Sequence, residues 1–321
     1  MHTFQELSDL FEERFNIRHF PDSPETLYNP AQYILDLGGK RIRPVLCLMA
    51  NELVNNVNPD SYLVASAIEL FHNFTLIHDD IMDKAPLRRG KETVHHKYGE
   101  ATALLAGDVM LVEAYNCLNK IKNTHVQQVI RLFNKTARQV CEGQQIDMDY
   151  EKKDVVSFGE YANMIELKTS VLLAASLQLG GIMGGAGEGN QHHLYQFGKH
   201  LGIAFQVQDD YLDAFGDPEK FGKQKGGDIL SNKKTFLSIH AMEVAGAEQK
   251  ALLRSLQAQN TPDKIDRVIA VYKDCNVDNW AKELKQKNYQ KAMDSLEDIA
   301  VLSSRKKPLA DLASSLMNRE Y

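Results

Sequence analysis

The sequence has little cysteine and no excess of positive charge. Its four cysteines among 321 residues are widely spaced and form no C-x-x-C pair, so we expect free thiols in a reducing compartment. Three of them lie in apolar helical sequence and are expected to be buried. The net charge of −6 gives no sign of general affinity for nucleic acid. Binding of an anionic substrate would therefore depend on clustered cations or a metal ion.

Long hydrophobic runs are also missing. No apolar run approaches the ~18–20 residues that cross a bilayer, although hydrophobic residues make up 43% of the chain, as in ordinary globular proteins. The first fifteen residues, MHTFQELSDLFEERF, are amphipathic and acidic, which is unlike a signal peptide. We therefore expect no transmembrane segment, a large core and a cytoplasmic location.

Strand signals are missing as well, and the helical period dominates. Helices are expected at residues 61–83, 117–142, 203–215 and 277–302, and the stretch 170–183 is apolar on nearly all sides, which is typical of a buried helix. No break is long enough to mark a linker, so the sequence predicts one all-α domain over residues 1–321. The expected breaks are Asp22–Pro24, Gly38–Gly39, Asn58–Pro59, residues 84–91, 184–190 and 216–235, and Pro308.

Two aspartate-rich boxes of the form Asp-Asp-x-x-Asp occupy residues 79–83 (DDIMD) and 209–213 (DDYLD). In each box the first and last aspartates lie one turn apart on the same helix face. Like charges at this spacing repel, and the C-terminal part of a helix disfavours anions. A hard divalent cation removes these costs, because Mg²⁺ takes carboxylate and phosphate oxygens. One such box could be an exposed acidic turn, but two boxes followed by basic residues predict a metal site.

Basic residues lie near both boxes. Arginine binds two phosphate oxygens with its planar fork, and glycine-rich turns let the backbone approach phosphate closely. Each cluster alone would be read as a solvated loop, but together with metal boxes they predict a site that stabilises a leaving diphosphate. The clusters are Lys40, Arg41 and Arg43 after Gly38-Gly39; Arg88 and Arg89 before Gly90; and Lys223, Lys225, Lys233 and Lys234 around Gly226-Gly227-Asp228.

Several ordered motifs resemble those of the trans-isoprenyl diphosphate synthases, the polyprenyl synthetase family. The resemblance implies a single-domain helical bundle with a central cavity, the isoprenoid synthase type I fold, usually as a homodimer. It also implies that an allylic diphosphate ionises, that the double bond of isopentenyl diphosphate attacks the cation, and that a proton and diphosphate leave. The motifs are residues 38–44 (GGKRIRP), 76–83 (LIHDDIMD), 88–90 (RRG), 168–169 (KT), 205–213 (FQVQDDYLD) and 222–228 (GKQKGGD).

The same resemblance implies a role for each motif residue, with the departing diphosphate as the base. Taken alone, His72 would be read as an interior histidine and Asp228 as a turn residue. The implied metal ligands, for three Mg²⁺ ions, are Asp79, Asp83 and Asp209, with Asp80 and Asp213 as ligands or their neighbours. The implied contacts of the allylic diphosphate (dimethylallyl, geranyl or farnesyl) are Arg88, Lys168, Lys223 and Lys233; those of isopentenyl diphosphate are Lys40, Arg43, His72 and Arg89; and Thr169 and Gln206 would stabilise the cation.

Product length in this family is set by residues just before the first box. Phe74 lies five residues before Asp79, only ~7.5 Å along a helix, so its ring would stop a growing tail early. Geranylgeranyl diphosphate (C20) is the first expectation and farnesyl diphosphate (C15) the alternative. On an ideal helix Thr75 and Phe71 project closer to the Asp79 face, so the assignment to Phe74 depends on the resemblance. Phe71 and Phe74 as plain core residues stay open.

Other functions fit the motifs less well. A longer-chain polyprenyl synthase would need a deeper tail pocket. A class I terpene cyclase shares the helices and the first box, but its second metal motif mixes Asn, Ser and Glu. A non-catalytic subunit of a heteromeric synthase loses its aspartate boxes, whereas this chain keeps both. A metal-binding helical protein without catalysis would not need the Lys and Arg clusters.

Overall fold

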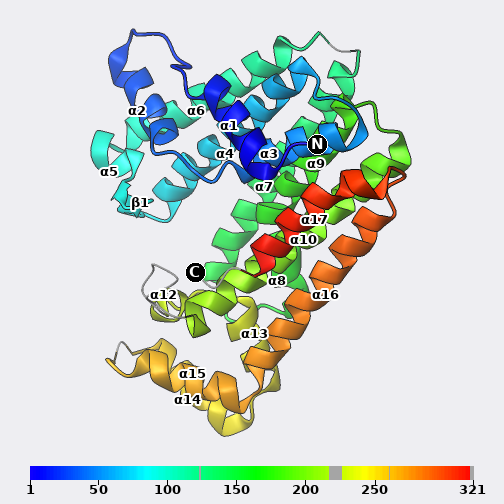
Figure 1. The fold of residues 1–321 in the computed structure, drawn as a ribbon. Coiled ribbons are helices and arrows are strands. Elements are labelled where there is room, and N and C mark those ends of the chain that lie inside the picture. Colours follow the sequence, from blue (N-terminus) through cyan, green and yellow to red (C-terminus); the bar gives the residue numbers. More distant parts are fainter. Residues whose placement is uncertain (123, 217–225, 260, 319–321) are drawn as a thin grey trace. The chain divides into compact units, whose positions relative to one another are not determined.

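A computed structural model describes residues 1–122, 124–216, 226–259 and 261–318 (Figure 1). These residues are almost entirely helical, with one short hairpin, so the all-α class is confirmed. They form two compact units, each described by itself. The first unit comprises residues 1–137, 175–195 and 299–309, and the second comprises the described parts of 138–174, 196–298 and 310–321. The helices that contribute residues to both units are α7 (Val126–Glu151), α9 (Val171–Met183), α10 (Glu188–Phe215) and α17 (Ser303–Met317).

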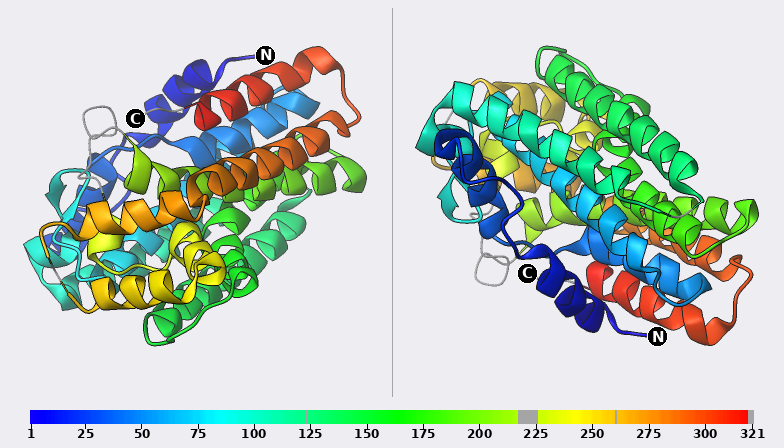
Figure 2. Two further views of the ribbon diagram at one scale, coloured as in Figure 1. Left: turned by 90° about the horizontal axis from the view of Figure 1, so that it is seen from below. Right: turned by 90° about the horizontal axis from the view of Figure 1, so that it is seen from above.

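In the first unit, the long helix α4 packs against α3 and α6, α2 and α5 pack on α6, and α1 packs on α3 (Figure 2). The faces that meet are lined by fully buried Leu, Ile, Val, Ala and Met side chains, and burying such side chains is the main favourable term in folding. The elements are α1 (Phe4–Phe15), α2 (Glu25–Asp36), α3 (Ile42–Val54), α4 (Pro59–Met82), β1 (Leu87–Arg88), β2 (Lys91–Glu92), α5 (Val94–Tyr98) and α6 (Glu100–Asn119).

Local signals explain where α4 begins. The side chain of Asn58 accepts a hydrogen bond from the backbone N–H of Asp60 at 2.9 Å, which satisfies one of the unpaired donors of the first turn. Pro59 occupies the first helical position, where a missing N–H costs nothing. The helix then runs for 24 residues and ends at Met82. The expected helix 61–83 is therefore confirmed, and it carries the first box at its C-terminal end.

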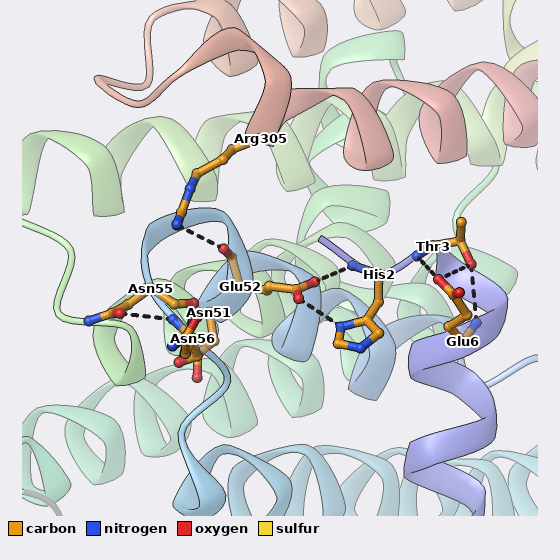
Figure 3. A network of polar contacts seen from close by, with 8 residues as sticks. All are labelled: His2, Thr3, Glu6, Asn51, Glu52, Asn55, Asn56 and Arg305. Carbon is orange, nitrogen blue, oxygen red and sulfur yellow. Dashed lines mark hydrogen bonds and ion pairs between the residues drawn. The ribbon is translucent and has the colours of Figure 1, made fainter.

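A polar network joins the N-terminus to the end of α3 (Figure 3). Glu52 accepts from the backbone N–H of His2 at 2.9 Å and lies 2.7 Å from Nδ1 of its ring. Arg305 donates to the carbonyl oxygen of Glu52 at 3.3 Å, which satisfies a carbonyl in the last turn of the helix. Nearby, the buried side chain of Asn51 accepts from the hydroxyl of Ser61 at 2.6 Å. The bond between Asn51 and Ser61 connects the end of α3 to the first turn of α4.

In the second unit, α13 packs against α8, α15 and α16, while α15 packs against α12 and α14. Aromatic rings fill the core, including Tyr161 and Phe236 with ring centroids 4.8 Å apart. Trp280 lies at its edge and stacks on His240 with centroids 3.7 Å apart. The elements are α8 (Phe158–Ile165), η1 (Glu166–Ser170), α12 (Gly227–Leu230), α13 (Phe236–Val244), α14 (Ala247–Gln257), α15 (Lys264–Asp274) and α16 (Val277–Glu297).

Several sequence expectations about helix limits are wrong. The expected break 184–190 is too long, because α10 already begins at Glu188. The stretch 117–142 is interrupted, because α6 ends at Asn119 and α7 begins at Val126; of the described residues between them, only Ile121 is buried. Helix α16 ends at Glu297 rather than 302. Pro308 lies inside α17 instead of breaking it. A proline removes one backbone hydrogen bond, and the buried apolar residues that follow it in α17 favour continuation of the helix.

The cysteines and the apolar helices agree with the sequence in part. All four cysteines are free of disulfides; Cys47 and Cys117 are buried, Cys275 is half-buried and Cys141 is exposed. Two helical stretches, Glu100–Asn119 and Phe158–Met183, are long and apolar enough to span a membrane by length and composition. In the second, 72% of the apolar window is buried within the protein, as in the core helix of a globular domain. The continuously apolar stretch 170–183 is thus a buried helix, as expected.

Candidate active site

The first box ends α4, and its three aspartates differ in burial. Asp80 is 2% exposed and accepts two hydrogen bonds from Arg88, whose Nε and Nη2 lie 2.8 and 2.7 Å from its oxygens. Asp79 is half-buried and lies 3.8 Å from the same guanidinium, and Asp83 is exposed. Burial lowers the pKa of Arg88, but the bonded Asp80 carboxylate more than offsets this and raises it overall. The outer aspartates thus lie on the more accessible side of the helix, beside a fixed positive charge.

Arg88 and Arg89 belong to the hairpin of β1 and β2, whose two-residue turn is Arg89-Gly90. These residues have φ angles of 54° and 73°, which is the combination of a type I′ turn. Positive φ is uncommon for arginine. Here the Arg89 side chain donates to the carbonyl oxygen of Gly38. The hairpin therefore joins the arginines after the first box to the glycine loop that precedes Lys40.

Arg43 and His72 form a hydrogen-bonded pair between α3 and α4, with Nη1 of Arg43 3.2 Å from Nε2 of His72. Arginine has only donors, so this nitrogen of His72 must accept and the ring is neutral there. Burial, together with the charges of Arg43, Arg89 and Arg88, holds the pKa of His72 well below its ordinary value. Within the described chain, the buried Nε of Arg43 has no hydrogen-bond partner. A donor of this kind fits an anionic ligand.

A buried ionic network beneath this pair was not predicted. Arg41 and Glu69 are each 3% exposed and form an ion pair, and Asn73 donates to the same carboxylate oxygen of Glu69 at 3.1 Å. Arg41 also donates to the carbonyl oxygen of Leu35 at 3.2 Å. The loop 38–41 is thereby anchored to α4. The sequence showed Arg41 among the basic residues, but no local signal linked it to a glutamate 28 positions away.

Phe74 is half-buried and belongs to an aromatic cluster. Its ring lies 5.6 Å from that of Phe71 and 4.7 Å from that of His78, measured between centroids. Phe71 is 1% exposed and also contacts Phe133 at 5.4 Å. The interpretation of Phe71 as a core residue is therefore confirmed. The role of Phe74 in product length stays a prediction.

The second box lies near the end of α10 and repeats the pattern of the first. Asp210 is 3% exposed; it accepts from Nε2 of Gln206 at 2.8 Å and from the backbone N–H of Phe236 at 3.0 Å. Burial raises the pKa of Asp210 to about 7, despite these two hydrogen bonds. Asp209 and Asp213 are half-buried and lie one turn apart on a shared face of α10. In both boxes, the middle aspartate is buried and accepts hydrogen bonds from other protein groups, and the two outer aspartates are more accessible.

Residues 226–228, which follow the second box in the sequence, form hydrogen bonds with its last aspartate. The backbone N–H of Asp228 donates to Oδ2 of Asp213 at 3.1 Å, and the N–H of Gly226 donates to the carbonyl oxygen of Asp213 at 2.8 Å. Asp228 therefore lies beside a candidate metal ligand. Lys233 is exposed and lies three residues after the end of α12. Lys223 lies outside the described residues.

Lys168 and Thr169 lie on η1, a π-helical turn between α8 and α9. Such turns occur mostly as single bulges, frequently at functional sites. Nζ of Lys168 is 2.6 Å from Oδ2 of Asp147 on α7. Gly143 lies one turn earlier on α7, and a Cβ there would be 2.3 Å from the backbone N of Lys168. Gly143 thus permits close packing of α7 on η1. The sequence predicted Lys168 and Thr169 but missed Asp147, Gly143 and the bulge.

The donor set at the two boxes fits a hard cation. The outer aspartates offer carboxylate oxygens, which Mg²⁺ prefers. Among residues 1–122, 124–216, 226–259 and 261–318, no group of three or more His, Cys, Asp or Glu side chains is placed to hold a metal ion by itself. Mg²⁺ commonly binds through one or two carboxylates and completes its shell with water and substrate phosphate oxygens. The arrangement within each unit is compatible with that mode.

Comparison with known proteins agrees with this geometry. Residues 24–275 match the model of the polyprenyl synthetase family. The geranylgeranyl diphosphate synthase of Methanosarcina mazei is 36% identical over 93% of this chain and 91% of its own length. The geranylfarnesyl diphosphate synthase of Natronomonas pharaonis is 33% identical over 93% and 91%. A crystal structure of a geranylgeranyl pyrophosphate synthase superposes with a TM-score of 0.94 at 42% identity, covering 100% of both chains.

The chain belongs to the polyprenyl synthetase family. The resemblance to the isoprenyl diphosphate synthases is thereby confirmed, as are the fold of these synthases and the prediction that the chain is a prenyltransferase. The family model covers every motif that carried the resemblance, from residue 38 to residue 228. The roles of the individual site residues remain predictions.

Proposed function

We propose that the protein condenses isopentenyl diphosphate with allylic diphosphates and releases geranylgeranyl diphosphate (C20). The observation that carries this proposal is the arrangement that the two boxes share. In each box the middle aspartate is buried and accepts hydrogen bonds from neighbouring residues, while the two outer aspartates are more accessible. Relatives named geranylgeranyl diphosphate synthase that align along most of the chain support the product.

Mg²⁺, bound by the outer aspartates Asp79, Asp83, Asp209 and Asp213, would supply Lewis-acid stabilisation of the allylic diphosphate as it leaves; three ions are proposed. Asp80 holds the guanidinium of Arg88 beside Asp79 through the paired bonds at 2.8 and 2.7 Å. Arg88 thereby supplies fixed positive charge where negative charge develops. A preorganised charge of this kind costs no reorganisation during the reaction.

The remaining cations divide between the two substrates. Lys168, Lys223 and Lys233 bind the allylic diphosphate, and Asp147 orients Lys168 through the contact at 2.6 Å. Arg43, His72, Lys40 and Arg89 bind isopentenyl diphosphate, with the buried Nε of Arg43 as one donor. The Nε2 atom of neutral His72 accepts from Arg43, so His72 also orients the Arg43 guanidinium. Thr169 and Gln206 stabilise the allylic cation, and the released diphosphate takes the proton.

Product length separates the C20 proposal from its neighbours. Phe74 packs on Phe71 and His78, so a tail that reaches this position meets a supported ring that cannot easily rotate away. Relatives named geranylfarnesyl diphosphate synthase show that longer products occur among similar proteins. The C15 alternative has less support, because the short-chain relatives named by product are geranylgeranyl or geranylfarnesyl synthases.

We further propose a single synthase domain over residues 1–321 that forms a cytoplasmic homodimer. One family model runs across both units, which supports one domain. An exposed apolar stripe on one face of α6 supports the dimer, because contiguous exposed apolar surface marks interaction sites. The stripe consists of Leu104, Leu105, Val112 and Tyr115, which are 38% to 57% exposed.

One assay tests the function directly. Purified protein is incubated with Mg²⁺, labelled isopentenyl diphosphate and each of the three allylic diphosphates, and the products are separated by chain length. A C20 product that disappears in Asp79→Ala and Asp209→Ala is expected. Lack of incorporation with every primer would refute the synthase proposal, and a main product of C30 or longer would refute the pocket argument. Sedimentation of Val112→Glu against the wild type tests the dimer.

A further inference from the structure

Lys264 begins α15 in the second unit and is only 1% exposed, which is rare for a lysine. Its Nζ donates to the carbonyl oxygen of Leu230 at 3.4 Å and to Oδ1 of Asn232 at 2.8 Å. Burying an ammonium group is costly unless it is hydrogen-bonded or paired. An apolar side chain would fill the same space without that cost. The presence of a lysine here therefore indicates a role for its hydrogen bonds.

Both acceptors belong to the C-terminal end of α12, a single helical turn of four residues. A cation is favoured there, because the last carbonyls of a helix lack donors within it. Asn232 follows with φ of 54°, and its Nδ2 donates to the carbonyl oxygen of Gln257 at 3.0 Å. Gln257 is the last residue of α14. Lys264 and Asn232 together therefore attach α12 to α14 and α15.

The N-terminal end of α12 contacts the second aspartate box, which lies on α10. The N–H of Asp228 donates to the carboxylate of Asp213 at 3.1 Å. Ile265, the neighbour of Lys264, packs on Gly226, since a Cβ on that glycine would lie 2.8 Å from Cγ2 of Ile265. The first turn of α15 thus holds α12 at both ends, with a charge at one end and an apolar contact at the other.

We propose that Lys264 is a positioning residue for the second box: by holding the C-terminal end of α12, it keeps the N–H of Asp228 against Asp213 and so orients that carboxylate for Mg²⁺ and the allylic diphosphate. A carboxylate fixed on one oxygen presents the other in a constant direction, and such partners of ligating groups tune metal affinity. Lys264 acts only through α12. The inference rests on the proposed function for the identity of the bound ligand.

The first test does not depend on activity. Lys264→Met removes the charge and keeps a side chain of similar length, and Lys273→Met, an exposed lysine on the same helix, is the matched control. Hydrogen–deuterium exchange is followed for the amides of residues 226–233, several of which donate within α12 or to Asp213. Exchange about tenfold faster is expected in Lys264→Met, because local opening of α12 becomes easier. Lys273→Met should match the wild type.

The second test uses turnover. In Lys264→Met, the Mg²⁺ concentration for half-maximal rate and the KM for the allylic diphosphate should each rise about tenfold, as for lost partners of metal ligands. The KM for isopentenyl diphosphate should not change, because Lys40, Arg43 and His72 lie in the first unit. A variant that was merely less stable would lower all activity together and would not separate the two substrates in this way.

Wild-type exchange together with a wild-type Mg²⁺ requirement in folded Lys264→Met would overturn the proposal. Folding is checked by circular dichroism and by the fluorescence of Trp280, the sole tryptophan, which lies in the same unit. If that variant does not fold, Asn232→Gly replaces it, since glycine keeps the positive φ and removes the amide that binds Lys264; it must show the same faster exchange. If the wild type turns over no substrate, the proposed function fails, and the exchange rates alone decide whether Lys264 holds α12 in place.

Discussion

A methyl group at Gly143 should remove most of the enzyme's activity. Gly143 is buried on α7, and a Cβ there would lie 2.3 Å from the backbone N of Lys168 and 2.7 Å from the carbonyl carbon of Leu167. Ordinary contact begins at 3.4 Å, so η1 would have to retreat by about 3.4 − 2.3 = 1.1 Å. The atoms in the way are backbone atoms, so no change of rotamer relieves the clash.

The retreat affects stability and catalysis by different amounts. Overpacking of this kind costs about 1–3 kcal/mol, and the better helix propensity of alanine returns up to about 1 kcal/mol, so Gly143→Ala should lose roughly 1–2 kcal/mol of unfolding free energy. A displacement of about 1 Å in a positioned catalytic group costs about 100-fold in rate. Lys168 is such a group under the proposed function, so kcat should fall by about two orders of magnitude.

Gly159→Ala is the matched control. Gly159 lies on α8 in the same unit, is exposed, and has no atom within 4 Å of the position of an added Cβ. Its kcat should equal that of the wild type, and its stability should rise by at most about 1 kcal/mol. The measurements are steady-state kinetics with saturating Mg²⁺ and urea unfolding of all three proteins. Wild-type kcat in folded Gly143→Ala would refute the reasoning about η1.

Three further predictions follow from the first unit. In a double-mutant cycle of Asp80→Asn and Arg88→Gln, urea unfolding should show a coupling of about 2 kcal/mol, below that of a fully buried pair because a quarter of the Arg88 side chain is exposed; additive effects would contradict the pairing. The NMR signals of the His72 ring should show no titration near pH 6.5, and stability should fall as the pH drops below about 6.5, because the unfolded chain then binds a proton that the folded ring resists; a midpoint near 6.5 would show that the ring is not held neutral. Phe74→Ala should give a product longer than that of the wild type by chromatography, whereas an unchanged product would move the floor of the tail pocket elsewhere.

Helices with clear local signals were predictable from the sequence. The expected break at Asn58–Pro59 and the long apolar run placed α4 to within two residues at its start and one at its end. The errors occurred where tertiary packing decides. Pro308 continues a helix because apolar residues after it are buried, and the sequence alone does not show what they pack against.

The candidate site was predictable where it follows a spacing rule. Residues four apart on a helix gave the two outer aspartates of each box, and the same rule accounts for the bond from Gln206 to Asp210. Long-range partners were missed, including Glu69 for Arg41 and Asp147 for Lys168. Such pairs depend on which helices pack together, and a carboxylate 21 or 28 residues away carries no local sign of its partner.

The π-helical turn η1 also limits how this stretch can change in evolution. A π turn holds one more residue than an α turn over a similar rise, and each α-helical residue turns the chain by about 100°. Deleting Thr169 or Ser170 would leave a regular α-helix, but it would rotate the side chains before the deletion, Lys168 among them, by that angle relative to the first turn of α9. Lys168 would then leave Asp147 even if every remaining residue were unchanged. We therefore expect the length of this segment to be more constrained than the identity of most of its residues.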